Sequence, residues 1–334
     1  VQSGSFNVAP RWASCVESPP SMSCMTNDNT GQVRATNRPN KTWRIDVSLI
    51  GVAIVWGASY LAAKDVAEEI SVASLLSWRF IITLAGMLAV WLFVRTRVTR
   101  REWLVGAILG TSQTAILYLE TWGVHLTSAT NAGLIISLSI IFTPLLESIW
   151  LRRWLPRPFF IAVTLAVVGV ALLVSGSGFH APTLGDLLML AAAAVRAVHV
   201  TASGVLTRGA TMSTVNITLV QAITGTAWTV ALAGGETLSA ARVLSPAGWA
   251  GLLFLGLACS VFAFLVQLWG IRRTSASRAS LLLGTEPIWA VVVGITLGGE
   301  ALTILAVIGA VLIVGSTYWA QGLETKHRLS RIND

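Results

Sequence analysis

Two charged side chains stand in the middle of strongly apolar stretches of this sequence, where they are suited to bind a charged ligand or each other. Arg196 lies about midway along the apolar segment at about 184–206, and Glu286 about midway along the one at about 275–297. Glu120 is expected farther out, toward the end of its segment. A charged group inside an apolar bundle is costly, so it usually faces a partner or a polar pathway. We therefore expect Arg196 and Glu286 to meet each other or a ligand.

Arg196 has two interpretations that the sequence leaves open. Its guanidinium could anchor a carboxylate or another anionic group, because its donors form a planar fork. It could instead form a permanent ion pair with Glu286, and a pair that opens to admit a ligand would satisfy both interpretations. Glu286 could also be the protonatable group of a proton antiporter, but a residue before a proline, here Pro287, more often serves a helix break.

Four further side chains complete the candidate substrate site. His199 follows Arg196 by three residues, hence on the same helix face, where it could relay protons or form an interior hydrogen bond. Arg79 is expected mainly to stabilise the fold. Trp56 and Gln113 could line a cavity, although single aromatic and amide side chains in a helix bundle usually serve packing. The candidate substrate-binding residues are Arg196, Glu286, Trp56, His199, Arg79 and Gln113.

The composition places these charges in a membrane protein. Of 334 residues, 54% are hydrophobic and 11% are charged, and the mean hydropathy is +0.72. Soluble globular chains carry about 25% charged residues, so this chain lacks the charge to cover a surface that faces water. The sequence predicts an all-α membrane protein. The net charge of +8 then reflects basic loops, and no nucleic-acid partner is expected.

Motifs for catalysis, metal binding and ATP binding are missing from the sequence. The three cysteines, Cys15, Cys24 and Cys259, show no paired spacing, so no disulfide framework, metal site or cofactor is predicted. The patterns HExxH, GxSxG and GxxxxGK[ST] do not occur. We expect neither an enzyme nor an ATP-driven pump.

Ten apolar segments follow one another along the chain. Each is close to the roughly 20 residues that cross a bilayer core as a helix. Helices are expected because an isolated strand cannot satisfy its backbone polar groups in lipid. The predicted spans are about 45–64, 72–94, 103–124, 127–151, 158–176, 184–206, 213–235, 248–270, 275–297 and 301–321.

Basic residues mark one side of the predicted bundle. Of the 23 lysines and arginines, nineteen fall before the first segment, after the tenth or in every second loop, and only Lys64 and Arg242 fall on the other side. Basic loops stay in the cytoplasm, so both termini should be cytoplasmic in a multi-pass inner (plasma) membrane protein. Residues 1–43, rich in polar residues, are predicted to be a disordered cytoplasmic tail, and 322–334 a second tail.

One sixteen-residue stretch occurs twice. Residues 119–134 match 266–281 at seven positions without a gap, at an offset of 147. The second copy carries three arginines in its turn and the first carries none, which indicates that the two turns face opposite sides of the membrane. The sequence therefore predicts two inverted five-helix repeats, 44–176 and 184–321, an architecture typical of secondary transporters.

The repeat extends beyond this stretch. Asp46 stands ten residues before Trp56, and Asp186 stands ten residues before Arg196, so both pairs are related by an offset of 140. Trp56 and Arg196 are thus equivalent positions of the two repeats.

Short motifs in the order and spacing of a known family run through both repeats. They are Trp56-Gly57-Ala58-Ser59, Arg79-Phe80, the Thr-Ser-Ala turns at 127 and 274, Gly185-Asp186-Leu187-Leu188, Glu286-Pro287 and Gly299-Glu300. Over about 45–321 the chain resembles the EamA family of the drug/metabolite transporter (DMT) superfamily. The resemblance implies a ten-helix carrier with a central substrate cavity between its halves. It implies no single substrate, because the family exports amino acids, metabolites and unrelated compounds. Arg196 departs from the family, which usually has an aromatic residue there.

Together these features predict a secondary-active transporter that exports a small metabolite, an amino acid or a related carboxylate-bearing compound, by alternating access. Its expected partners are a small-molecule substrate and the lipid bilayer, with protons as a candidate coupling ion. The alternatives are a drug or multidrug exporter of the same superfamily, a channel, and a membrane protein without a transport function. A channel fits less well because inverted halves in one chain favour alternating access over a continuous pore.

Overall fold

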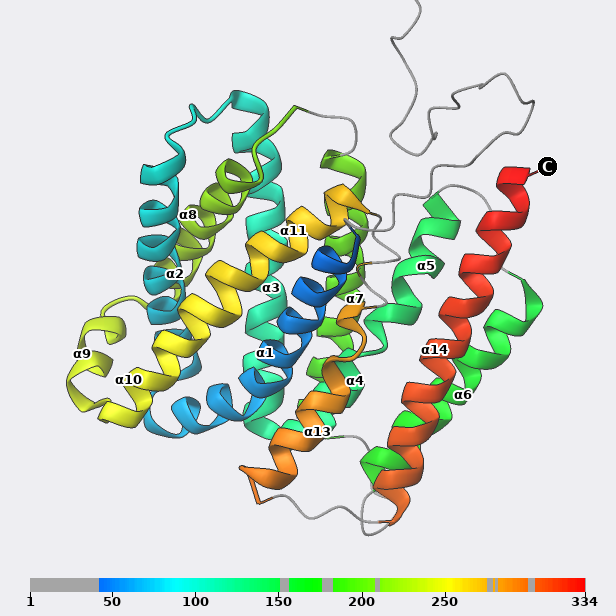
Figure 1. Cartoon of the computed structure of the whole chain (residues 1–334). Coiled ribbons are helices and arrows are strands. Elements are labelled where there is room, and N and C mark those ends of the chain that lie inside the picture. Colours follow the sequence, from blue (N-terminus) through cyan, green and yellow to red (C-terminus); the bar gives the residue numbers. More distant parts are fainter. Residues whose placement is uncertain are drawn as a thin grey trace, which may run out of the picture. The chain divides into compact units, whose positions relative to one another are not determined.

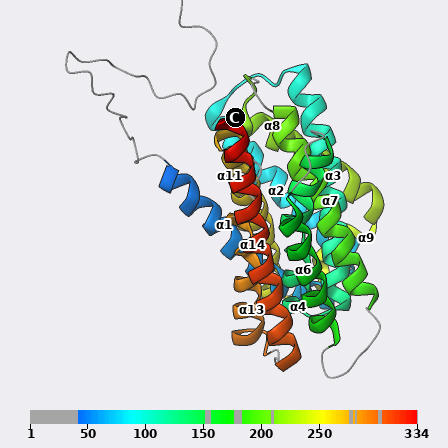
Figure 2. The same cartoon turned by 90° about the vertical axis from the view of Figure 1, so that its right-hand side faces the viewer.

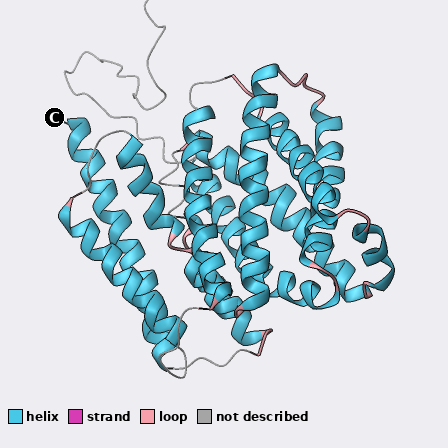
Figure 3. Cartoon of the chain, turned by 180° about the vertical axis from the view of Figure 1, so that it is seen from behind, coloured by secondary structure: helices cyan, strands magenta, loops and turns pink. Residues whose placement is uncertain are grey.

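Helices form the described part of the chain in this computed structural model. It describes residues 42–150, 156–175, 183–207, 211–274, 279, 282–299 and 304–333, and no strand occurs among them (Figure 3). Residues 44–334 form one compact unit. Almost all of the predicted tail at 1–43 lies outside the described residues, as do parts of several predicted loops.

The helices follow the apolar segments of the sequence, with two additions, a short helix α9 between the seventh and eighth segments and a π-helix, η1, within the eighth. The elements are α1 (Thr42–Glu69), α2 (Val72–Val94), α3 (Arg100–Leu126), α4 (Ala129–Ile136), α5 (Ser139–Trp150), α6 (Arg157–Ser175), α7 (Leu184–Thr207), α8 (Thr214–Ala233), α9 (Glu236–Val243), α10 (Pro246–Leu253), η1 (Phe254–Phe262), α11 (Ala263–Arg273), α13 (Glu286–Thr296) and α14 (Ile304–Asn333).

Several of these helices are long and apolar enough to cross a bilayer. Among the described residues six stretches qualify: Trp43–Glu69, Val72–Val94, Ala129–Leu146, Leu184–Thr207, Thr214–Ala233 and Pro246–Arg273. Shorter apolar helices occur at Arg157–Gly169, Glu286–Thr296 and Val307–Ala320. The prediction of a multi-pass, all-helical membrane protein is therefore confirmed, and the count of ten spans stays a prediction.

The helix of the fourth segment is interrupted, although Ala129–Leu146 as a whole is long and apolar enough to cross a bilayer. The helix ends at Ile136 and starts again at Ser139. The Ser137 hydroxyl donates to the carbonyl of Leu134 at 2.6 Å, so a side chain competes with the backbone for that acceptor. In the ninth segment α13 starts afresh at Glu286, with Pro287 in its first turn, where a missing N–H is harmless.

The two interruptions occupy equivalent positions of the sequence repeat. Ser139 begins α5 and Glu286 begins α13, and these residues are 147 positions apart. That is the offset of the repeated sixteen-residue stretch. The helix starts are therefore a shared property of the two repeats.

The eighth segment changes its winding partway, because η1 is a π-helix between two α-helices. From this wider turn the carbonyl of Cys259 accepts from the indole Nε1 of Trp56 at 2.9 Å, and the Ser260 hydroxyl accepts from Nε of Arg79 at 3.1 Å. Single π-helical turns often mark functional sites. Here the turn fixes two of the candidate site residues.

Equivalent helices of the two predicted repeats run in opposite directions. In Figure 1, α1 begins at the upper end of the bundle and α7 at the lower end, while α3 runs downward and the α10–η1–α11 segment runs upward. Packing shows the same inversion. Gly123 of α3 lies against Met189 of α7, and Gly270 of α11 lies against Leu49 of α1. The two glycines are 147 residues apart and their two partners 140, the offsets of the sequence repeat.

The helices pack against one another in several groups. Long contacts join α3 with α7 and α8, α2 with α8, and α6 with α14. The α6–α14 pair lies side by side in two views (Figures 1 and 2). The largest cluster of buried apolar side chains takes residues from almost all of the described helices, α1, α3, α4, α7 and α13 among them.

Basic side chains gather at one end of the bundle, the upper end in Figure 1, where α1 begins and α14 ends. The helix ends that meet there include the C-terminus of α2, the N-terminus of α3 and the C-terminus of α11. Among the described residues, they carry Arg95, Arg97, Arg100, Arg101, Arg272 and Arg273. The basic loops that the sequence assigns to one side of the membrane thus lie at one end of the bundle.

Gly57→Ala is expected to destabilise the protein by about 1–3 kcal/mol, because the added methyl overpacks a helix contact. A Cβ at Gly57 of α1 would lie 2.5 Å from Cβ of Trp289 and 2.8 Å from the backbone nitrogen of Ala290 in α13. Equilibrium unfolding in mixed detergent micelles measures the change. Gly51→Ala on the same helix is the control, since its Cβ would meet only Phe262 at 3.9 Å. Equal losses in the two variants would contradict the close approach.

Candidate functional site

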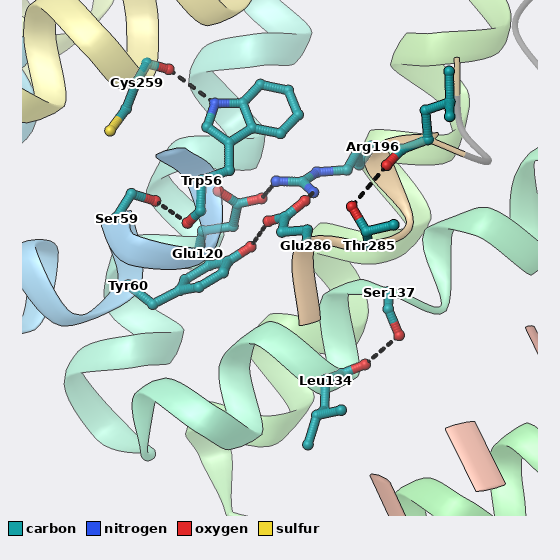
Figure 4. A network of polar contacts seen from close by, with 11 residues as sticks. Trp56, Ser59, Tyr60, Glu120, Leu134, Ser137, Arg196, Cys259, Thr285 and Glu286 are labelled. Carbon is teal, nitrogen blue, oxygen red and sulfur yellow. Dashed lines mark hydrogen bonds and ion pairs between the residues drawn. The ribbon is translucent and has the colours of Figure 1, made fainter. Parts of the chain in front are cut away.

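The guanidinium of Arg196 lies between two carboxylates at the centre of the bundle (Figure 4). One terminal nitrogen, Nη1, is 2.8 Å from Oε2 of Glu286, and the other, Nη2, is 2.6 Å from Oε1 of Glu120. The three residues come from α7, α13 and α3. Buried ion pairs of this kind need good geometry to offset the loss of hydration, and both pairs here are charge-assisted hydrogen bonds.

Tyr60 of α1 extends this network. Its hydroxyl donates to Oε1 of Glu286, so each oxygen of that carboxylate has a donor. Glu286 also starts α13, and an anion is favoured at a helix N-terminus. Glu120 and Tyr60 belong to the first predicted repeat, and Arg196 and Glu286 to the second. The network therefore joins the two halves at two points.

Trp56 of α1 forms a wall beside the guanidinium. Cζ of Arg196 lies 5.0 Å from the centroid of the indole ring, within the range of a cation–π contact. The indole is fixed by its bond to Cys259, and the Ser59 hydroxyl donates to the carbonyl of Trp56 at 2.7 Å. The aromatic surface is thus held in place independently of Arg196.

Two small cavities adjoin Arg196 and Trp56. Their volumes, about 10 and 20 Å³, leave room for about one water molecule each. Neither of these two cavities is large enough for a metabolite. Both cavities are lined by Trp56, Arg196 and Gln267, the first also by Ser59, Arg79, Gln113, Glu120 and His199, and the second also by Ser137, Ser139, Thr143 and Glu286.

Equivalent positions of the two repeats meet around these cavities. Each of three pairs joins a charged side chain from one repeat with an uncharged one from the other. The pairs are Arg196 with Trp56 at an offset of 140, and Glu120 with Gln267 and Glu286 with Ser139 at an offset of 147. Residues that are equivalent in the sequence repeat therefore lie close together in the structure, around the same two cavities.

A sequence model of the EamA-like transporter family matches residues 43–175 and, a second time, residues 183–320. The chain belongs to this family. The predicted family membership is therefore confirmed, and the chain is a multi-pass membrane transporter.

This EamA-like chain is similar to relatives that are named as transporters. It is 27% identical over 300 residues to Uncharacterized transporter YyaM of Bacillus subtilis (strain 168), covering 85% of this chain and 95% of the relative. It is 24% identical over 275 residues to an uncharacterized transporter of Archaeoglobus fulgidus, covering 79% and 93%. A solved crystal structure shares the fold with a TM-score of 0.64 at 20% identity, covering 84% of this chain and 97% of its own.

The EamA-like structure places all six predicted candidates around the two cavities. Arg79 is buried, and its Nε donates to the Ser260 hydroxyl. Nδ1 of His199 lies 2.8 Å from the Ser112 hydroxyl, so this histidine is hydrogen-bonded. Gln113 lines the first cavity. A role of these side chains in substrate binding stays a prediction.

Glu120 is the central residue that sequence reasoning missed. It was predicted farther out, yet its side chain reaches Arg196, because α3 packs along α7. Two signals in the sequence point to it. Glu120 follows Gln113 by seven residues, which puts both on one helix face, and it aligns with Gln267 in the repeat.

Tyr60→Phe is expected to destabilise this EamA-like transporter by about 1–3 kcal/mol, because it removes a donor from the buried carboxylate of Glu286. Tyr118→Phe is the matched control. Its hydroxyl is buried and has no hydrogen-bond partner among the described residues, so its loss should be neutral or stabilising. Unfolding in mixed micelles compares the two. A neutral Tyr60→Phe would show that the hydroxyl does not support Glu286.

Proposed function

We propose that this EamA-like protein is a secondary-active carrier that exports a small carboxylate-bearing metabolite, an amino acid or a related compound, by alternating access. One observation carries the proposal: a buried guanidinium at the centre is held by a carboxylate on each side. Arginine binds carboxylates through two parallel N–H donors. Each carboxylate here accepts from one N–H of the guanidinium, and a substrate carboxylate would pair with these same donors.

Substrate binding is an exchange of carboxylates in this proposal. The carboxylate of the substrate takes the place of Glu120 or Glu286 on the guanidinium, so the donors of Arg196 are never left unpaired. The fixed indole of Trp56 offers an aromatic surface to the apolar part of the substrate. Hydroxyls at the interrupted fourth span, those of Ser137 and Ser139, supply further polar contacts.

Alternating access follows from the small cavities and the inverted halves. The cavities are too small for a metabolite, so a substrate enters only when the halves move apart on one side. Opening breaks contacts between the halves, among them the one from Glu120 to Arg196. The repeated glycine contacts of α3 with α7 and of α11 with α1 give each end of the bundle the same kind of joint. The proposal includes ten spans in two inverted five-helix repeats.

Arg196→Gln is expected to lower export by more than about 30-fold while the protein still reaches the membrane, since removing one partner of a buried charge pair costs about 2–5 kcal/mol. Arg196→Lys should recover little, because a point charge replaces a planar fork. The substrate is first found by comparing metabolites released by cells with and without the protein. Counterflow of that labelled metabolite in proteoliposomes then measures each variant and separates a carrier from a channel.

Two controls separate cargo recognition from stability. Arg101→Gln, at an exposed position of α3, should leave counterflow unchanged. Arg196→Gln combined with Glu120→Gln removes the orphaned carboxylate, so stability should recover and transport should not. Full transport by the double variant would show that Arg196 is only structural. A screen that finds lipophilic cations instead of carboxylates would favour the drug-exporter alternative.

The cytoplasmic position of both termini is tested by cysteine labelling. In a background with Cys15, Cys24 and Cys259 replaced by serine, we expect Ser239→Cys in α9 to react with a membrane-impermeant maleimide in intact cells. Arg101→Cys, at the opposite end of the bundle, should react only after permeabilisation. Both positions are exposed, so accessibility differs only through the membrane. The reverse pattern would place both termini outside.

A further inference from the structure

We propose that Glu120 takes up one proton when an anionic carboxylate occupies Arg196, so that the ligand and the proton cross the membrane together. The inference rests on the proposed function, because it assigns the coupling group of the same site. It differs from the sequence-based hypothesis of a proton antiporter that uses Glu286.

The ionisable groups at the two cavities balance one another without a ligand. Among the described residues that line them, Arg79 and Arg196 are positive, Glu120 and Glu286 are negative, and His199 is hydrogen-bonded to a neutral hydroxyl. The sum is zero with a neutral imidazole. An anionic ligand adds one negative charge to this largely buried centre once the two halves enclose it. An unbalanced charge in such a space is costly, and a proton on one carboxylate removes it.

The surroundings of Glu120 include charged groups from several helices. Helices α4 and α8, which also pack against α3, carry no titratable side chain. The titratable and charged groups at the centre around Glu120 are Tyr60 of α1, Arg79 of α2, Arg196 and His199 of α7, and Glu286 of α13. Of these, Arg196 is the one that bonds directly to Glu120.

Glu120, rather than Glu286, is the carboxylate that can separate from Arg196. Both oxygens of Glu286 accept hydrogen bonds, one from Tyr60 and one from Arg196, and its position at the start of α13 favours the anion. Glu120 has one donor, Arg196, and among the described residues its second oxygen has none. When a ligand displaces Glu120 from the guanidinium, its carboxylate is left without a donor.

The proton step is an ordinary acid–base exchange. Hydronium in the first cavity, which Glu120 lines, gives its proton to the carboxylate, an O–H bond forms on Glu120 and one water molecule is left. The carried load, one carboxylate anion and one proton, is then electrically neutral. A zwitterionic ligand is already neutral and needs no proton, because its ammonium can pair with Glu120.

Infrared spectroscopy of the purified full-length protein in lipid nanodiscs tests the assignment without a known substrate. Arg196→Gln removes one positive charge, which leaves the centre with the same charge as ligand binding does. We expect this variant to show the C=O band of a protonated buried carboxylic acid at neutral pH, and the otherwise wild-type protein to lack it. Adding Glu120→Asp should shift the band, and adding the matched Glu286→Asp should not.

A second measurement covers the case in which Arg196→Gln does not fold. Acidifying the otherwise wild-type protein should produce a first buried C=O band that shifts in Glu120→Asp and stays in Glu286→Asp. A band that follows Glu286 in either measurement overturns the assignment, as does a folded Arg196→Gln without a band. Failure of the proposed function gives a different result: Arg196→Gln would keep counterflow of the labelled metabolite.

Discussion

Charges buried in a bundle that faces lipid have to balance, and that condition governs the centre of this EamA-like transporter. Arg196 is largely buried, beside cavities with room for about one water each, so two carboxylates come within hydrogen-bond distance to offset its lost hydration. Meeting this condition places four helices. The chain has to bring α3 and α13 to opposite sides of the guanidinium on α7, with α1 close enough for Tyr60 to support Glu286. The close approach of α1 to α13 at Gly57 serves the same requirement.

Much of the helical framework could be predicted from local sequence patterns. The second segment was placed at 72–94, where α2 lies, because an apolar run bounded by polar residues is a local property. The start of α3 is equally local, since Thr99 and Glu102 cap it reciprocally. The interruption after Ile136 and the π-helix escaped prediction. Both depend on which acceptors and neighbours a packed helix meets, and such contacts join residues far apart in the sequence.

The candidate site was also predictable only in part, because some of its residues show in local sequence patterns and others depend on how distant helices pack. Arg196 and Glu286 could be recognised because a charged residue within an apolar segment is evident from the sequence alone. The reach of Glu120 depends on how α3 packs against α7, and periodicity alone does not give the distance between two helices. The repeat offers the missing information, because it brings Glu120 and Gln267 to matching places around the cavities. Comparing the two repeats of a chain can therefore identify residues of the central site that the pattern of a single segment does not reveal.

The three pairs of equivalent residues at the centre have a consequence for kinetics. A rotation that exchanges the halves brings Trp56 onto Arg196, and Ser139 onto Glu286, so it superposes the helices and not the charges. Under the proposed alternating-access mechanism, the inward-facing and outward-facing forms would therefore present different electrostatic environments to water and would differ in energy. The half-saturating concentrations at the two membrane faces would then differ. Gradients would still decide the net direction of flow, but loading from one compartment would be faster than loading from the other.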